Sequence, residues 1–467
     1  MAIFIGRMLC INFILKERLY KMNVNFLFDE FKENGDPWWN VCDMSFSKLE
    51  KYDLYPASFF WWQSPIKEVL TYNNTNDISE NEINFVQTTS HLLNENEINI
   101  YPVFISDKTF FCPGAVMWIP EYVVNKVNEG LLYLMIANYF ETDFLDHEEF
   151  IGRLYSFLAV INIKNFTHVK IVGNDFISEK IINNIETNKE KIKYITSYTF
   201  EKFYVKRLQI LNQHFEIEDH INHVDKENTF LMQIGSPRHF RYFMYKVLEY
   251  SGLLKNALYS YMPFDRGLLT DNVSYDSFDR YKSEYFYGDT VSIENQLNDE
   301  KFNDFYQWIV SNDKIESKSL PNCRLVNNNI FNTSPYTDIN WLRQTYFSFI
   351  IETQVSNLNS FITEKTFKMI FCGHPFILYS SPGSLSELHK LGYQTYPELF
   401  DESYDEMPNS FEKMFFIMEQ IKKWTLPENK KELEEKIKLI KPKLLHNRML
   451  YLSKDHSLFW NKFKEKS

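Results

Sequence analysis

The stretch FSFIIETQVSNLNSFITEKTFKMIFCGHPFILYSSPGS, residues 347–384, decides the fold of the second half of the chain. It holds an apolar run at 346–352, an amphipathic run at 363–371 and a second apolar run at 375–379. Short apolar runs separated by a helical period predict buried parallel strands joined by a crossover helix. Gly373 follows the amphipathic run, as a left-handed helix C-cap requires. The stretch therefore predicts one β-α-β unit of an α/β layer fold.

The same alternation continues on both sides of this unit. Other expected strands are 24–28, 100–105, 168–172, 193–197, 229–234 and 257–261, and other expected helices are 121–129, 146–161, 178–188, 238–250 and 384–391. Gly252 and Gly392 follow two of these helices in the way that Gly373 does. The two halves of the chain therefore predict two α/β layer folds.

The length of 467 residues favours two domains, at roughly 150 residues each, and permits three. A polar stretch at 216–228 has little periodicity and is the expected linker, which places an N-terminal domain at 22–225 and a C-terminal domain at 226–420. Residues 1–21 lack the charge order of a signal peptide and are expected to lie outside the fold, either as an extension or because the start codon is read too far upstream. Residues 421–467 are expected to form a helical segment.

The charge is distributed unevenly along the chain. Acidic residues outnumber basic ones by 62 to 50, and a net charge of −12 argues against a generally basic nucleic-acid coat. Residues 422–467 nevertheless contain 13 Lys/Arg and 6 Asp/Glu, a local charge of +7 that leaves −19 for the rest. This segment is either a solvated helix face or a basic interaction surface, which would dock well on an acidic domain.

Several classes of protein are excluded by what the sequence lacks. There is no G-x-G, no phosphate loop and no C-x-x-C, and glycine is scarce at 13 residues. The five cysteines are far apart and odd in number, which fits a reducing cytoplasm. The sequence contains no run of about 18 uncharged apolar residues, so no membrane span is expected. His220 and His223 have no third ligand at sensible spacing, so no metal site is expected.

Charged side chains follow the expected strand at 346–352. Glu352 ends this strand, a polar loop follows, and the next helix opens with Thr363, Glu364 and Lys365. Ligands of open α/β sheets bind at the carboxyl ends of strands, where Glu364 could accept two ribose hydroxyls and Lys365 could offset a diphosphate. A favourable helix-dipole carboxylate would explain Glu364 alone, but it would not explain Lys365 beside it.

Two further turns are compatible with phosphate. Arg238, His239 and Arg241 crowd the first turn of a helix after the Gly-Ser-Pro turn at 235–237. A helix start with guanidinium groups is an anion trap, although the same arginines could simply point to solvent. The S-P-G-S turn at 381–384 could offer backbone N–H groups to a ligand, or it could be an ordinary capped turn.

These motifs together resemble a known family. The ordered set of F-x-x-x-x-E at 347–352, F-I-T-E-K at 361–365, a G-x-P-F strand and S-P-G-S is similar to the C-terminal donor domain of α-1,3-fucosyltransferase-like glycosyltransferases. The stretch 233–261, with its G-L-L turn at 252–254, resembles the first α/β unit of the same domain. The motif core covers less than a fifth of the chain.

The resemblance implies a GT-B architecture, in which two Rossmann-like domains face a cleft. The nucleotide-sugar donor would sit in the C-terminal domain and the acceptor mainly against the N-terminal one, without a required metal. Carried over by position, Glu364 matches the ribose carboxylate, Lys365 the diphosphate lysine and Glu352 the strand-end glutamate near the sugar. Arg238 matches a diphosphate arginine, with Arg241 one turn further on.

The chain departs from the family pattern in ways that leave the donor open. Thr353 follows Glu352 where the family has asparagine, and Asn357 nearby is the candidate substitute. The region after Lys365 looks more like divergent phage or viral relatives than cellular fucosyltransferases. The sugar and the nucleotide, GDP- or UDP-linked, are therefore not fixed by the sequence.

The chemistry of the residues agrees with a transferase that needs no metal. No D-x-D occurs, so the leaving diphosphate would be neutralised by Arg, Lys and helix N-termini. Transfer to a hydroxyl also needs a general base, usually a carboxylate. Asp36, in the N-G-D-P-W-W loop at 34–39, is the first candidate, and Asp107 and Asp175 also follow expected strands.

Three functions remain open at this point. The favoured one is a cytoplasmic glycosyltransferase that moves a sugar from a nucleotide sugar to the hydroxyl of a glycan or another acceptor. The second is a phage-type enzyme that glycosylates a hydroxylated DNA base, with the basic C-terminal segment on the phosphates. The third is a non-catalytic protein of the same fold that binds nucleotide sugars.

Overall fold

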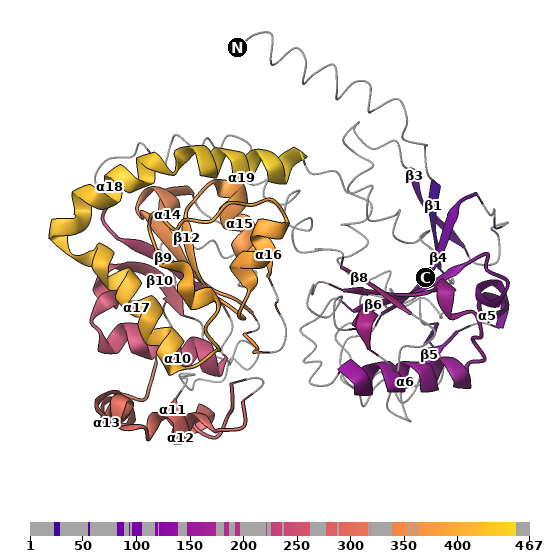
Figure 1. Cartoon of the computed structure of the whole chain (residues 1–467), viewed down its shortest axis with the longest axis horizontal. Helices are drawn as coiled ribbons and strands as arrows, with labels where there is room; N and C mark the ends of the chain where they lie inside the picture. Colours follow the sequence, from indigo (N-terminus) through magenta and orange to yellow (C-terminus); the bar gives the residue numbers. More distant parts are fainter. Residues whose placement is uncertain are drawn as a thin grey trace, which may run out of the picture. The chain divides into compact units, whose positions relative to one another are not determined.

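A computed structural model gives the structure of the chain (Figure 1). The residues that it describes are 23–28, 55–56, 82–87, 93, 96–104, 117–119, 121–138, 147–173, 182–185, 192–196, 221, 226–235, 238–261, 277–286, 289–315, 318, 339–353, 355–357, 360 and 362–453.

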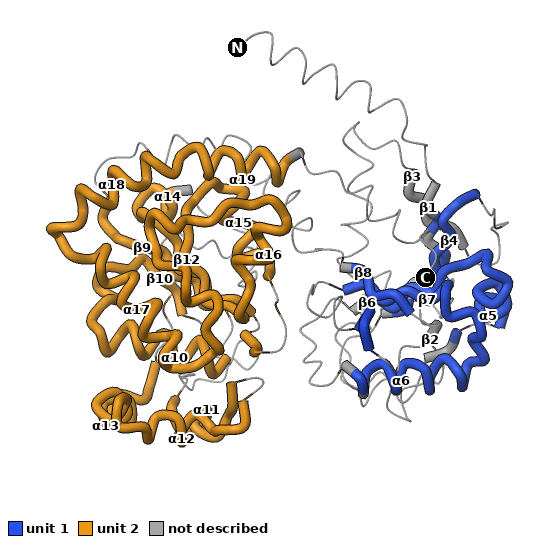
Figure 2. The backbone as a smooth tube through the Cα atoms, in the orientation of Figure 1, with its two compact units in different colours: residues 1–173, 179–199, 455–467 blue, residues 174–178, 200–454 orange. Residues whose placement is uncertain are grey.

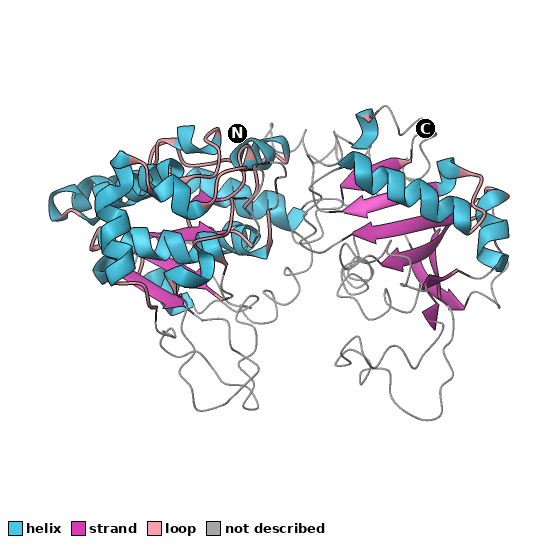
Figure 3. Ribbon diagram, turned by 90° about the horizontal axis from the view of Figure 1, so that it is seen from below, coloured by secondary structure: helices cyan, strands magenta, loops and turns pink. Residues whose placement is uncertain are grey.

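The chain forms two compact units (Figure 2). The first comprises residues 1–173, 179–199 and 455–467, and the second comprises residues 174–178 and 200–454. Each unit is an α/β structure with its own parallel sheet. In each, strands lie side by side with helices packed along them (Figure 3). Residue 225, the boundary expected from sequence, falls inside the second unit.

The first unit has a six-stranded sheet in the order β3-β1-β4-β6-β7-β8, with every neighbouring pair parallel. The strands are β1 (Asn23–Phe28), β3 (Glu82–Gln87), β4 (Ile98–Phe104), β6 (Tyr133–Asn138), β7 (Val169–Gly173) and β8 (Lys193–Thr196), and helices α5 (Glu121–Asn128) and α6 (His147–Val160) belong to the same unit. A separate two-stranded pair joins β2 (Tyr55–Pro56) to β5 (Met117–Trp118).

Four of these six strands were predicted from the sequence, and β3 and β6 were not. The apolar run of β6 begins only five residues after α5 ends, and a short apolar run cannot be told from a buried helix by periodicity alone. Two buried asparagines fix the register of β1 against β4. Asn25 and Asn99 are cross-strand partners, and Asn25 Nδ2 donates to Asn99 Oδ1 at 3.0 Å. A one-residue slip would bury both amides without this bond.

The second unit has a four-stranded parallel sheet in the order β10-β9-β11-β12. The strands are β9 (Phe230–Ile234), β10 (Ala257–Tyr261), β11 (Phe347–Ile351) and β12 (Phe376–Tyr379), and all four were predicted. All nine residues of β11 and β12 are buried, as expected of parallel strands covered on both faces.

The strand order of the second unit reverses between β9 and β11. The chain passes from β9 to β10 on one side, then returns to form β11 and β12 on the other side. Right-handed crossovers in opposite directions place α10 (His239–Tyr250) and α15 (Glu364–Cys372) on opposite faces of the sheet. The carboxyl ends of β9 and β11 therefore form a topological switch point, the place where open α/β sheets bind ligands.

Aromatic packing fixes the helices on the two faces of this sheet. On one face, Phe243 of α10 contacts Phe411 of α17 (Phe411–Thr425), with ring centroids 5.4 Å apart. On the other face, Phe367 and Phe371 of α15 contact Tyr451 of α19 (Lys441–Ser453) at 6.4 and 5.9 Å. Buried aromatic pairs of this kind add about 0.5–1.5 kcal/mol each beyond the area they bury.

The C-terminal helices correct one expectation. A change to long helices was expected at residue 421, but α17 begins at Phe411. The described part of the basic segment also belongs to the core of the second unit, because Leu433 and Ile437 of α18 (Lys430–Leu439) are buried in it. Helices α11 (Phe278–Tyr281), α12 (Ile293–Leu297), α13 (Asn303–Ser311) and α14 (Ile339–Arg343) were not predicted.

Among the described residues, no helix is both long enough and apolar enough to cross a membrane.

The expected glycine caps are confirmed, because Gly252, Gly373 and Gly392 have φ of 67°, 60° and 90°. We expect Gly373→Ala to lower the free energy of unfolding of the second unit by about 1 kcal/mol, because a Cβ is strained in this left-handed conformation. Gly152→Ala is the matched control. Gly152 lies within α6 with nothing within 4 Å of an added Cβ, so alanine should stabilise by about 0.4–1 kcal/mol. Urea unfolding measures both changes, and equal effects of the two variants would contradict the assignment.

Candidate functional site

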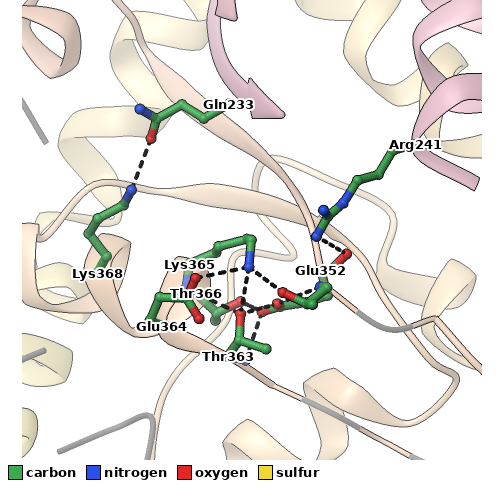
Figure 4. A network of polar contacts seen from close by, with 9 residues as sticks. Gln233, Arg241, Glu352, Thr363, Glu364, Lys365, Thr366 and Lys368 are labelled. Carbon is green, nitrogen blue, oxygen red and sulfur yellow. Dashed lines mark hydrogen bonds and ion pairs between the residues drawn. The ribbon is translucent and has the colours of Figure 1, made fainter. Parts of the chain in front are cut away.

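The candidate site lies at the switch point of the second unit (Figure 4). Glu352 follows β11 directly, and α15 begins at Glu364 with Thr363 as its N-cap. Arg241 comes from the first turn of α10, the helix after β9. The structure therefore brings together groups from two crossover helices and the end of the strand between them.

Glu352 is fully buried, and its carboxylate closes the start of α15. Oε1 accepts the Thr363 backbone N–H at 3.1 Å and the Thr366 hydroxyl at 2.6 Å. Oε2 accepts the Thr363 hydroxyl and the Thr353 backbone N–H, the latter at 3.3 Å. The carboxylate thus satisfies a backbone donor that the helix start would leave unpaired, at the end where the helix dipole favours a negative charge.

Arg241 and Lys368 connect α10 and α15 to the sheet. The Nη2 atom of Arg241, which is 2% exposed, donates to the backbone carbonyl of Glu352 at 2.9 Å. Lys368 reaches to β9, where its Nζ donates to Gln233 Oε1 at 3.0 Å. Burial lowers the pKa of Lys368 to about 8. Arg241 therefore ties α10 to the end of β11, and Lys368 ties α15 to β9.

The ammonium group of Lys365 is surrounded by three side-chain acceptors. Its Nζ donates to the Thr353 hydroxyl, to the Thr363 hydroxyl at 3.2 Å and to Glu364 Oε1 at 2.9 Å. The Lys365 side chain is 21% exposed and that of Glu364 is 7% exposed. Of the site residues predicted from sequence, Glu352, Thr363, Glu364 and Lys365 thus form one network.

The start of α10 has a different character. Arg238 is its N-cap residue in an extended conformation, the Arg238 side chain makes no capping hydrogen bond, and the first turn contains no acidic residue. Arg238 and Arg241 are the cations here. Burial, with a smaller contribution from Arg238, lowers the pKa of His239 to about 4, so His239 is neutral at pH 7. The expectation that three cations crowd this turn therefore reduces to two arginines.

The turn at 381–384 is an ordinary capped turn, which settles the alternative left open by the sequence. Asp405 caps α16 (Ser384–Lys390): its Oδ1 and Oδ2 accept the N–H groups of Leu385 and Ser386 at 3.0 and 3.2 Å. The Gly383 N–H donates to the carbonyl of Asp405 at 2.8 Å. These donors are taken by the protein itself, so the turn does not offer them to a phosphate.

The remaining predicted residues are not part of this network, or they lie outside the described part of the chain. Asn357 is partly buried, and its Oδ1 accepts the backbone N–H of Asn409 at 2.6 Å. The predicted residues that lie outside the described part of the chain are Asp36, Asp107, Asp175, His220, His223 and residues 1–21. Among the described residues, no three His, Cys, Asp or Glu side chains are grouped so that they could hold a metal ion.

Sequence reasoning missed Thr366 and the Lys368–Gln233 bond. The signal was present, because Thr363 and Thr366 are three residues apart and therefore share one face of the helix start. Two hydroxyls on that face next to a strand-end carboxylate indicate a cap. The pairing of Lys368 with β9 needs the sheet order, which the spacing does not contain.

Comparisons with known proteins do not assign the chain to a family. No family model matches the chain, and no curated protein and no solved structure is similar enough to count as a match. The function must therefore be inferred from the geometry of this site.

The three helices that follow β9, β11 and β12 differ in what their starts can bind. α15 is closed by Glu352 and α16 by Asp405, each a carboxylate of the protein itself. α10 begins with two arginines and, in the described part of the chain, no carboxylate cap. A helix N-terminus with arginines attracts anions, so the start of α10 is compatible with an anionic ligand.

We expect Glu352→Gln to destabilise the second unit by about 2–4 kcal/mol, because an amide NH₂ would face donors that now meet a carboxylate oxygen. The control is Glu412→Gln, which removes an exposed charge paired with Lys301 and should cost less than about 0.5 kcal/mol. Denaturant unfolding measures both. If Glu352→Gln lowered the free energy of unfolding as little as the control does, the hydrogen bonds of the Glu352 carboxylate to the start of α15 would not be needed for stability.

Lys368 gives a pH dependence with a defined sign. Its folded pKa, about 8, is below the ordinary 10.5, so the unfolded chain holds more protons between these values and folding stability rises with pH in that window. Relative to Lys368→Met, the wild type should gain roughly 2 kcal/mol in free energy of unfolding from about pH 7.5 to about pH 9.5. Unfolding curves at several pH values measure this difference, and parallel stability profiles would contradict it.

Proposed function

We propose that this protein is a glycosyltransferase that uses a nucleotide-sugar donor, and that its second unit binds the donor. The observation that carries the proposal is the placement of Arg238 and Arg241 at the start of α10 and of Glu364 and Lys365 at the start of α15, the two helices that follow the adjacent strands β9 and β11. Helix N-termini that carry arginine and lysine are suited to a diphosphate.

The donor would be bound in three parts. The diphosphate lies at the start of α10, where two guanidinium groups and Lys365 offset its charge. Glu364, at the start of α15, accepts hydrogen bonds from the ribose hydroxyls. The sugar then extends from the diphosphate toward the acceptor.

The transfer step needs a base and a stabilised leaving group. The acceptor hydroxyl attacks the anomeric carbon, the bond from that carbon to the diphosphate oxygen breaks, and the electron pair leaves with the nucleoside diphosphate. Arg238, Arg241 and Lys365 would stabilise the charge that develops on it. The hydroxyl proton passes to a carboxylate, for which Asp36 is the candidate because it follows β1 in the chain.

Glu352 takes a different role from the one that the family resemblance implies. All four of its described side-chain contacts are to the start of α15 or to Thr353. We therefore assign it the positioning of α15, and not direct contact with the sugar. The proposal retains the GT-B architecture, which is supported by two α/β units whose parallel sheets both reverse their strand order.

A ligand screen tests the proposal. We expect at least one of GDP, UDP, ADP and CDP to raise the unfolding temperature by several degrees without added magnesium, since a ligand at about 100 times its Kd stabilises by about 2.7 kcal/mol. Arg238→Met should reduce the shift. Arg448→Met is the control, because Arg448 lies over Phe371 of α15 and takes no part in the proposed contacts.

Donor hydrolysis or transfer, followed by mass spectrometry, then separates an enzyme from a binding protein. No thermal shift with any of the four nucleotides would argue decisively against the proposed function.

A further inference from the structure

The segment between β10 and β11 packs along α10, and its residue Phe286 reaches the start of that helix. The described parts of this segment include α11, α12 and α13, which lie beside α10 (Figure 1). Phe286 lies between α11 and α12 and is fully buried. Its ring contacts that of His239, the first residue of α10, with ring centroids 5.9 Å apart. This segment therefore covers the helix start to which the proposed function assigns the diphosphate.

A series of contacts connects Phe286 to both arginines of this helix start. The rings of His239 and Phe240 pack edge to face, with centroids 5.1 Å apart. The guanidinium group of Arg241 lies over the Phe240 ring, 5.7 Å from its centre. Arg238 directly precedes His239 in the chain. A shift of His239 would therefore reach Arg238 through the backbone and Arg241 through the Phe240 ring.

The turn that carries Phe286 is itself fixed. Tyr285 and Ser292 form an antiparallel bridge across it, and the carbonyl group of Phe286 accepts the backbone N–H of Asp289 at 2.8 Å. The Phe286 ring also contacts that of Phe411, the first residue of α17, at 5.6 Å. A side chain held in this way can support the start of α10.

The contact with Phe286 also keeps the His239 ring away from water. His239 is 7% exposed, and its burial, with a smaller contribution from Arg238, lowers its pKa to about 4. If Phe286 were truncated, water would reach the imidazole, and the pKa of His239 would rise toward the ordinary 6.5. This pKa therefore reports whether Phe286 covers the helix start, independently of any ligand.

Resting on the proposed function, we propose that Phe286 is a positioning residue for the donor diphosphate. It packs on His239 and fixes the first turn of α10, so that Arg238 and Arg241 are in place before the ligand binds. Groups that are fixed in advance bind more tightly, because less conformational entropy is lost on binding. The segment between β10 and β11 thus shapes the binding site without contacting the ligand through Phe286.

Phe286→Ala in the full chain tests this role, with Phe305→Ala as the matched control. Phe305 is 2% exposed and belongs to the same aromatic cluster, but it contacts Tyr250 at the end of α10. Both variants lose a buried ring, but only Phe286→Ala should raise the pKa of His239. NMR titration of isotope-labelled histidine measures this pKa, and His239→Gln assigns the signal. If an alanine variant does not fold, Phe286→Val and Phe305→Val replace the pair.

Isothermal titration calorimetry measures the effect on the site, with the nucleoside diphosphate that binds best among GDP, UDP, ADP and CDP. We expect Phe286→Ala to bind it about tenfold more weakly than the wild type, and Phe305→Ala less than about twofold more weakly. In an Arg238→Met background, Phe286→Ala should have little further effect, because both changes act on the same helix start.

The outcomes separate the two proposals. If the wild type binds the nucleotide but Phe286→Ala binds it as tightly as Phe305→Ala does, the positioning role is wrong and the proposed function stands. Additive losses from Phe286→Ala and Arg238→Met have the same meaning, and so does an unchanged His239 pKa in Phe286→Ala. If the wild type binds none of the four nucleotides, the proposed function is wrong, and the positioning of a diphosphate falls with it.

Discussion

The buried carboxylate of Glu352 is the constraint on which the site depends. It closes the start of α15 with hydrogen bonds to Thr363 and Thr366, and Arg241 holds its carbonyl group from the opposite face of the sheet. A buried carboxylate without donors would cost several kcal/mol of folding free energy. The carboxylate therefore needs these donors, and the donors would be unpaired without the carboxylate. The positions of Glu364 and Lys365 follow from this clamp, because both belong to the helix turn that it fixes.

The strand order explains why this clamp lies where a ligand can bind. The reversal between β9 and β11 sends α10 and α15 to opposite faces and brings their starts to one edge of the sheet. Two of the three helix starts that follow strands at this edge are closed by carboxylates of the protein, Glu352 and Asp405. In the part of the chain that the structure describes, α10 lacks such a cap and carries arginines instead, so an anion from outside is best accommodated there.

Much of the second unit could be predicted from the sequence, because its strands are short apolar runs and Gly252, Gly373 and Gly392 mark helix ends. The motif indicated that Glu352 and residues 363–365 belong to one site, but not that the Glu352 carboxylate bonds to Thr363 and Thr366. The sequence could not show that Asp405 fills the turn at 381–384, since the two are distant in the chain, nor that His239 is buried and neutral. Helices α11–α14 escaped prediction because four or five residues give no clear period in three of them, and β6 resembled a buried helix.

The proposed function requires that the start of α10 and Lys365 bind the diphosphate of the same nucleotide. A crystal structure of the full chain with the best-binding nucleoside diphosphate tests it most directly. The diphosphate is expected at the start of α10, within hydrogen-bond distance of Arg238 and Lys365. A diphosphate bound away from Arg238 and Lys365 would contradict the proposed function.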